Sequence, residues 1–226
     1  MSAFISIALD DRILLMSDTA VVDGEGRLCA LSGKTVRWNM PPMAIAIRGL
    51  AGDAGGILQR RILPSVRKTT SFDHALERVR ASLRWARPVA ERATCILLLA
   101  GIQANGRPAQ HVVTTGPSDI GIEPLCLTRM DDIAVCGNLD ADGFRAAGLD
   151  IAALKHDPIR HGPAFFQAFR RPVPYPWSDG KAFSGVGGQL QLTTITAAGC
   201  EWRTIAYWPD WLEQPIDPKR KFVPVL

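Results

Sequence analysis

Short apolar segments separated by tight turns open and close this chain, and they restrict its fold more than any other feature of the sequence. Near the start, Phe4 to Leu9 and Ile13 to Met16 flank a short acidic turn. Near the end, Gly188 to Thr196 and Glu201 to Tyr207 flank a turn that contains glycine. Strands joined by so few residues pair antiparallel, because a parallel crossover needs about a dozen residues or more. The sequence therefore predicts a β-hairpin near each end.

Further segments predict strands and helices in the rest of the chain. The additional strands are Lys34 to Trp38, Met43 to Ile47, Cys95 to Gly101, His111 to Thr114 and Asp132 to Cys136. The helical patterns lie between the blocks of strands, at about 54–63, 72–83, 141–147 and 164–170. The pattern over 72–83 is the clearest, because its apolar residues fall on one face and Ser71 is suited to cap its first turn.

The order of these elements predicts the fold class. Strands grouped in blocks, with helices grouped between them, favour stacked antiparallel sheets flanked by helices over a parallel β-α-β series. The sequence contains no internal repeat, low-complexity segment or linker. We therefore predict an α+β fold in a single domain that covers residues 1–226.

Composition and charge exclude several classes of protein. Hydrophobic residues at 47% and charged residues at 21% are ordinary for a globular domain, which argues against disorder or a coiled coil. The longest apolar run, Cys95 to Ala100, is far shorter than the roughly 20 residues of a membrane-spanning helix. No basic region precedes the first apolar segment, so we expect no signal peptide and a cytoplasmic protein. A net charge of +4 without a basic stripe predicts no nucleic-acid partner.

The sequence offers no motif for a metal or an organic cofactor. Its five cysteines are scattered and never form C-x-x-C, and the pair His156 and His161 lies in a segment interrupted by proline. The Gly-Lys-Thr at 33–35 resembles the end of a phosphate-binding loop, but Leu28 stands where that loop needs its first glycine. We therefore expect no cofactor and no metal.

One constellation of residues does predict chemistry. If Met1 is removed, Ser2 carries a hydroxyl beside its own α-amine, whose ordinary pKa of about 7.7–8.0 suits a general base. Asp18 and Lys34 follow Ser2 by 16 and 32 positions. A lysine held by an aspartate stays oriented and promotes attack of a hydroxyl on a carbonyl. These residues predict a serine nucleophile with Lys34 or the α-amine as base.

With these residues, the chain resembles proteasome β subunits and the related bacterial proteasome-like peptidases of the N-terminal-nucleophile hydrolase superfamily. In that family a first-residue threonine is followed at the same two offsets by the catalytic aspartate and lysine. The resemblance covers roughly the first 55 residues and includes Ala44 to Gly49, where the family has the glycine of its oxyanion hole. It implies a four-layer αββα sandwich of stacked antiparallel sheets, and it implies that Gly49 binds the oxyanion.

Later motifs of the family match less well. The family's Gly-Ser-Gly after a central strand corresponds most nearly to Cys136-Gly137-Asn138, so Asn138 replaces a serine and can still form hydrogen bonds. The family's Asp-x-x-Ser-Gly-Gly is echoed by Asp179 to Gly188, but Lys181 stands three residues before Ser184, where the family has its aspartate. Serine as the nucleophile also lacks the methyl group of threonine.

The sequence therefore predicts a peptidase that cleaves peptide or amide bonds with Ser2, assisted by Asp18, Lys34, Gly49, Asn138 and Ser184. The resemblance also implies a homo-oligomeric ring that acts on polypeptides, with an ATP-dependent unfoldase as a possible partner. Two alternatives stay open: a catalytically silent subunit that serves as a scaffold, and an amidase of the same superfamily that acts on a small molecule.

Overall fold

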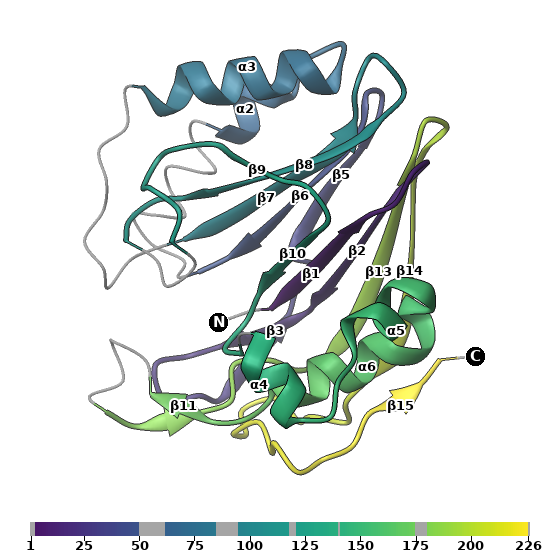
Figure 1. Ribbon diagram of the computed structural model, residues 1–226. Coiled ribbons are helices and arrows are strands. Elements are labelled where there is room, and N and C mark those ends of the chain that lie inside the picture. The colour runs from purple at the N-terminus through teal and green to yellow at the C-terminus, as the bar shows by residue number, and fades with distance from the viewer. Residues whose placement is uncertain are drawn as a thin grey trace.

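The computed structural model describes residues 3–49, 62–84, 95–117, 121–139, 141–174 and 180–225. Most of the described strands belong to two large antiparallel sheets (Figure 1). The six-stranded sheet has the order β10 (Ile133–Cys136), β1 (Phe4–Ala8), β2 (Ile13–Asp18), β13 (Gln189–Thr196), β14 (Gly199–Tyr207) and β15 (Val223–Pro224). The five-stranded sheet has the order β5 (Thr35–Asn39), β6 (Pro42–Arg48), β7 (Ile96–Ile102), β8 (Pro108–Thr114) and β9 (Thr128–Met130).

Smaller elements complete the described part. Two short antiparallel pairs are β3 (Ala20–Val22) with β4 (Leu28–Leu31), and β11 (Val173–Pro174) with β12 (Ala182–Phe183). The helices are α2 (Leu63–Val66), α3 (Phe72–Leu83), α4 (Ala141–Ala146), α5 (Ile151–His156) and α6 (Pro158–Phe169).

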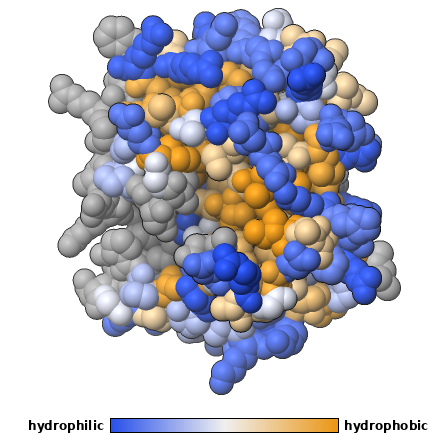
Figure 2. Space-filling view, viewed as in Figure 1, coloured by the Kyte–Doolittle hydropathy of each residue, from blue (hydrophilic) through white to orange (hydrophobic). Residues whose placement is uncertain are grey.

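The core divides into layers because side chains alternate between the two faces of each strand. Phe4 and Leu15 of the six-stranded sheet share one apolar cluster with Leu98 and Val112 of the five-stranded sheet, so the two sheets pack face to face. On the opposite faces, α6 covers the six-stranded sheet and α3 covers the five-stranded sheet (Figure 1). Figure 2 shows apolar surface in the middle of this view, over the region where the two sheets meet.

Several sequence predictions are confirmed. The turn at Asp10-Asp11 joins β1 to β2 in an antiparallel pair, and Ala198 lies in the turn between β13 and β14. Helix α3 matches the predicted range of 72–83, and the Ser71 side chain accepts a hydrogen bond from the His74 N–H at 3.1 Å. The predicted helix at 54–63 lies mostly outside the described residues.

The predicted four-layer αββα sandwich is wrong. The described part of the chain is mostly β, with several antiparallel sheets and two substantial helices, α3 and α6, of 12 residues each. The other described helices have six residues or fewer, so within the described residues each outer face carries one long helix and not a full layer of helices. The physical reason lies in the segment 141–169, which Asp150 and Asp157 divide by capping new helix starts with their side chains. The helix predicted at 164–170 accordingly begins earlier, at Pro158.

A buried ion pair fixes the end of α6 to the C-terminal segment. Arg170 is fully buried, and its two terminal nitrogens donate to the two carboxylate oxygens of Asp210 at 2.8 Å each. Arg170 also donates to the carbonyl oxygens of Val186 and Asp217. Because each charge is desolvated, the pair is stable only while both partners are present.

We therefore expect Asp210→Asn to lower the free energy of unfolding by about 3 kcal/mol, because it leaves the Arg170 charge buried without a counter-ion. Urea denaturation followed by circular dichroism measures this change. Asp142→Asn is the matched control, since Asp142 pairs with Arg145 at the surface, and it should change stability by less than about 0.5 kcal/mol. Equal effects of the two substitutions would contradict this interpretation.

Candidate functional site

The site is built around the carboxylate of Asp18, the last residue of β2, whose side chain is fully buried. Its Oδ1 accepts the backbone N–H of Ala3 at 2.9 Å. Its Oδ2 accepts the backbone N–H groups of Ala20 and Gly187, both at 3.2 Å. The same Oδ2 lies 2.9 Å from Nζ of Lys34. A buried carboxylate is tolerated when donors surround it in this way.

Lys34 lies immediately before β5, and its position follows from the pairing of β5 with β6. The backbone N–H of Ile47 donates to the Lys34 carbonyl at 3.0 Å, which extends that ladder by one bond. The Lys34 side chain is 10% exposed and points at Asp18. Burial lowers the pKa of the Lys34 ammonium, although the Asp18 carboxylate acts in the opposite direction. A lysine with a lowered pKa gives up its proton more readily than a solvated one.

The predicted nucleophile, Ser2, lies outside the described residues. Its neighbour in the chain is described, however: the backbone nitrogen of Ala3 is the atom that binds Asp18 Oδ1. Ala3 itself is 1% exposed. The peptide bond that joins Ser2 to Ala3 therefore includes a nitrogen in direct contact with the ion pair.

Gly49 directly follows Arg48, the last residue of β6. Strand β6 pairs with β5, which Lys34 precedes. The Gly49 φ of +143° lies in a region that side chains disfavour, and an added Cβ would lie 2.4 Å from Sγ of Cys95. The fold therefore requires glycine here for backbone geometry and for close packing on Cys95. These contacts account for the glycine whether or not its N–H binds an oxyanion.

The described hydrogen bonds of the Asn138 side chain go to the end of α6 and not to Asp18. Its amide nitrogen donates to the carbonyl oxygens of Phe169 and Arg171, at 3.0 and 3.1 Å, and so joins the segment after β10 to the end of α6. Its Oδ1 is buried and has no hydrogen-bond partner among the described residues. Phe4 pairs with Cys136, the last residue of β10. Asn138 therefore follows the end of β10 that lies beside the start of β1, next to Ala3.

Ser184 is brought to the site only indirectly. It is 2% exposed, and its hydroxyl donates to the Val186 carbonyl at 3.4 Å. The contact with Asp18 comes three residues later, from the N–H of Gly187. Lys181, at the position of the family's aspartate, is exposed.

Sequence reasoning missed the backbone donors at this site. Ala3 and Gly187 have no reactive side chains, so nothing in their chemistry marked them. The signal in the sequence is the glycine-rich segment Ser184 to Gly188, because glycine allows backbone N–H groups to approach a buried group closely. An added Cβ at Gly187 would lie 2.5 Å from Oδ2 of Asp210, so glycine is required where this turn meets two buried carboxylates.

Within the described residues, no group of three or more His, Cys, Asp or Glu side chains is arranged to hold a metal ion. All five cysteines lie in the described part, and none of them forms a disulfide bond. None of the described helices combines the length and the apolar character needed to cross a bilayer.

No protein-family model matches this sequence, and no curated protein matches it either. The function is therefore argued from the contacts of Asp18 and Lys34 and from the chemistry of the residues around them.

We expect Asp18→Asn to destabilise the protein by about 3 kcal/mol. The substitution leaves the Lys34 charge without its buried partner and turns an amide N–H toward backbone donors. Chemical denaturation monitored by tryptophan fluorescence measures the change. Asp11→Asn removes a carboxylate that pairs with Arg12 at the surface and should leave the midpoint unchanged. A normal midpoint in Asp18→Asn would show that the ion pair does not hold these segments together.

Proposed function

We propose that the protein hydrolyses peptide or amide bonds with the hydroxyl of Ser2 as nucleophile, after Met1 has been removed. The observation that carries the proposal is the buried pair of Lys34 and Asp18, whose carboxylate also binds the backbone N–H of Ala3. A cation and a carboxylate are thus held next to the residue that follows Ser2. The spacing that suggested this chemistry in the sequence supports the same assignment.

In this mechanism Lys34, in its neutral form, accepts the proton of the Ser2 hydroxyl as Oγ attacks the substrate carbonyl. The C–N bond of the amide then breaks, the leaving amine takes up a proton, and the acyl group stays on Ser2 as an ester. Water attacks the ester and releases the acid, which regenerates the hydroxyl. Burial favours the neutral form of Lys34, and Asp18 holds its Nζ in place.

Two further groups are proposed to support these steps. The backbone N–H of Gly49 is assigned to the developing oxyanion by the resemblance to the proteasome-like peptidases. Oδ1 of Asn138 is a buried acceptor without a partner among the described residues. A free α-ammonium or α-amine at Ser2 would supply the N–H donor that this oxygen lacks. Ser184 contributes only by shaping the turn that presents the Gly187 N–H to Asp18.

The proposed substrates are polypeptides, enclosed in a homo-oligomeric ring and supplied, where folded proteins are degraded, by an ATP-dependent unfoldase.

A catalytically silent scaffold is the second candidate. It is favoured by Asn138, whose amide nitrogen is engaged with the end of α6, and by the exposed Lys181 in place of an aspartate. Hydrolysis of casein but not of small amides supports the peptidase; the reverse supports a small-molecule amidase.

A peptide epoxyketone tests the nucleophile directly, because it forms a ring adduct only with a hydroxyl and an adjacent free amine. We expect the untagged protein to lack Met1 and to gain the mass of one inhibitor, mapped to Ser2 by peptide mass spectrometry. Ser2→Ala should not react, whereas Ser32→Ala, which changes an exposed hydroxyl two residues before Lys34, should react normally. Retention of Met1 with no adduct would favour the scaffold.

The pH dependence of the hydrolysis rate should follow the protonation state of Lys34. We expect the hydrolysis rate to rise with pH as Lys34 loses its proton, with a midpoint below its ordinary pKa of 10.5, because burial disfavours the charged form. Lys34→Arg keeps the positive charge but cannot act as a base, so the rate should fall by about 10²-fold or more and lose this limb. An unchanged pH profile in Lys34→Arg would assign the base to another group.

A further inference from the structure

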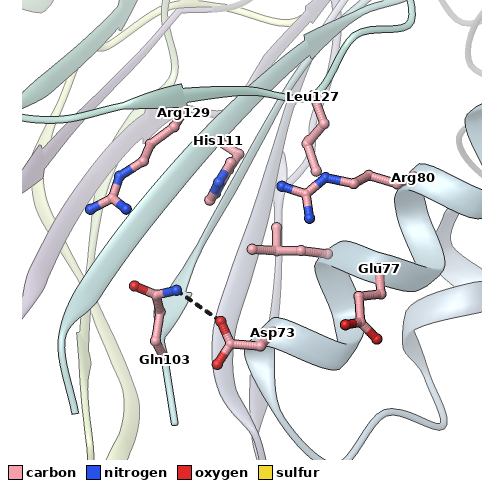
Figure 3. A pocket seen from close by; sticks show the side chains of 8 residues that line it. Asp73, Glu77, Arg80, Gln103, His111, Leu127 and Arg129 are labelled. Carbon is pink, nitrogen blue, oxygen red and sulfur yellow. Dashed lines mark hydrogen bonds between the residues drawn. The ribbon is translucent and has the colours of Figure 1, made fainter. Parts of the chain in front are cut away.

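A cavity of about 350 Å³ lies on the outer face of the five-stranded sheet, where α3 faces β8 and β9 (Figure 3). This volume is at the lower end of the range of about 300–1,000 Å³ found for pockets that hold small molecules. The cavity lies on the opposite side of this sheet from the apolar layer shared with the six-stranded sheet. It is therefore a separate site from the pair of Asp18 and Lys34.

One end of the cavity is basic. Arg80 of α3 and Arg129 of β9 flank His111 of β8, and the three side chains lie together in Figure 3. Arg80 forms no ion pair within the described part of the chain, and Arg129 has only a surface contact with Asp131 at 3.2 Å. Two guanidinium groups without a buried counter-ion provide a binding site for a carboxylate.

His111 brings a buried polar atom without a described partner to this end of the cavity. The residue is buried on the outer face of the sheet and is only 5% exposed. Its Nδ1 has no hydrogen-bond partner among the described residues. Burial, together with the charges of Arg80 and Arg129, lowers the pKa of His111 to about 4. The ring is therefore neutral at physiological pH and leaves the positive charge to the two arginines.

The other end of the cavity is acidic. The two carboxylate oxygens of Asp73 accept hydrogen bonds from Nε2 of Gln103 and from the Ala104 N–H, each at 2.8 Å. The bond from Ala104 is the main reason that the pKa of Asp73 lies below its ordinary value, so this carboxylate stays ionised. Glu77, one turn further along α3, is exposed and forms no ion pair within the described residues. Figure 3 shows Asp73 and Glu77 on the side of the cavity away from Arg129 and His111.

We propose that this cavity binds a small zwitterion, a dipeptide or free amino acid, with its carboxylate between Arg80 and Arg129 and its ammonium group toward Asp73 and Glu77. A simple anion would match only the basic end and would face the two carboxylates at the other. The inference does not rest on the proposed hydrolase activity. If that activity is present, its products belong to the same chemical class, and the site would respond to them.

Alanylalanine and three related probes test the charge pattern. Binding is followed by isothermal titration calorimetry and by the NMR signals of the His111 ring, which should move on titration. Compared with alanylalanine, we expect at least tenfold weaker binding of N-acetyl-alanylalanine, which lacks the ammonium, and of alanylalanine amide, which lacks the carboxylate. Inorganic phosphate should also bind at least tenfold more weakly. Phosphate that binds as tightly as alanylalanine would overturn the assignment, as would the absence of saturable binding at millimolar concentration.

Exposed arginines allow a matched set of variants. Arg80→Ala and Arg129→Ala should each weaken alanylalanine binding at least tenfold without a change in the circular dichroism spectrum. Arg145→Ala removes an arginine of α4 that pairs with Asp142 at the surface, and it should bind as the unchanged protein does. Equal binding by all three variants would show that the cavity is not the site. Ser2→Ala should keep full binding, which separates this result from any failure of the proposed hydrolase.

Discussion

The buried carboxylate of Asp18 is the interaction on which the candidate site depends. Its desolvation is offset by donors from separate parts of the chain: the backbone of Ala3, the backbone of Gly187 and the ammonium group of Lys34. A buried charge with fewer partners would be strongly destabilising. The site can therefore form only when β1, the residue before β5 and the turn before β13 have come together. The proposed chemistry needs the same arrangement, since it places a lysine with a lowered pKa near the chain's start.

The turn before β13 connects this carboxylate to the second buried ion pair. The N–H of Gly187 donates to Asp18, and the N–H of Gly188 donates to Asp210, the partner of Arg170. Consecutive amides thus bind two buried acids that belong to different parts of the core. The packing leaves no room for a side chain at residue 187. The proposed active site is in this way tied to the position of α6 and of the C-terminal segment.

Sequence reasoning succeeded where a pattern is local and failed where it depended on what packs against it. The hairpins and α3 were predictable, because period-two alternation, short turns and the Ser71 cap are properties of neighbouring residues. The four-layer αββα sandwich did not follow from these local patterns. The sequence predicted helices at about 141–147 and 164–170, whereas Asp150 and Asp157 cap the starts of α5 and α6 between and before these ranges, and the described part is mostly β.

The sequence by itself determined the antiparallel pairing of β1 with β2 and the candidacy of Asp18 and Lys34, because fixed offsets along regular strands carry that information. Only the tertiary structure decided what surrounds these groups. It engaged the amide nitrogen of Asn138 with the end of α6, and it placed His111 between arginines that are distant in the chain. Burial, the pKa of a side chain and the partner of a polar atom depend on contacts between residues far apart in sequence, and local patterns do not encode those contacts.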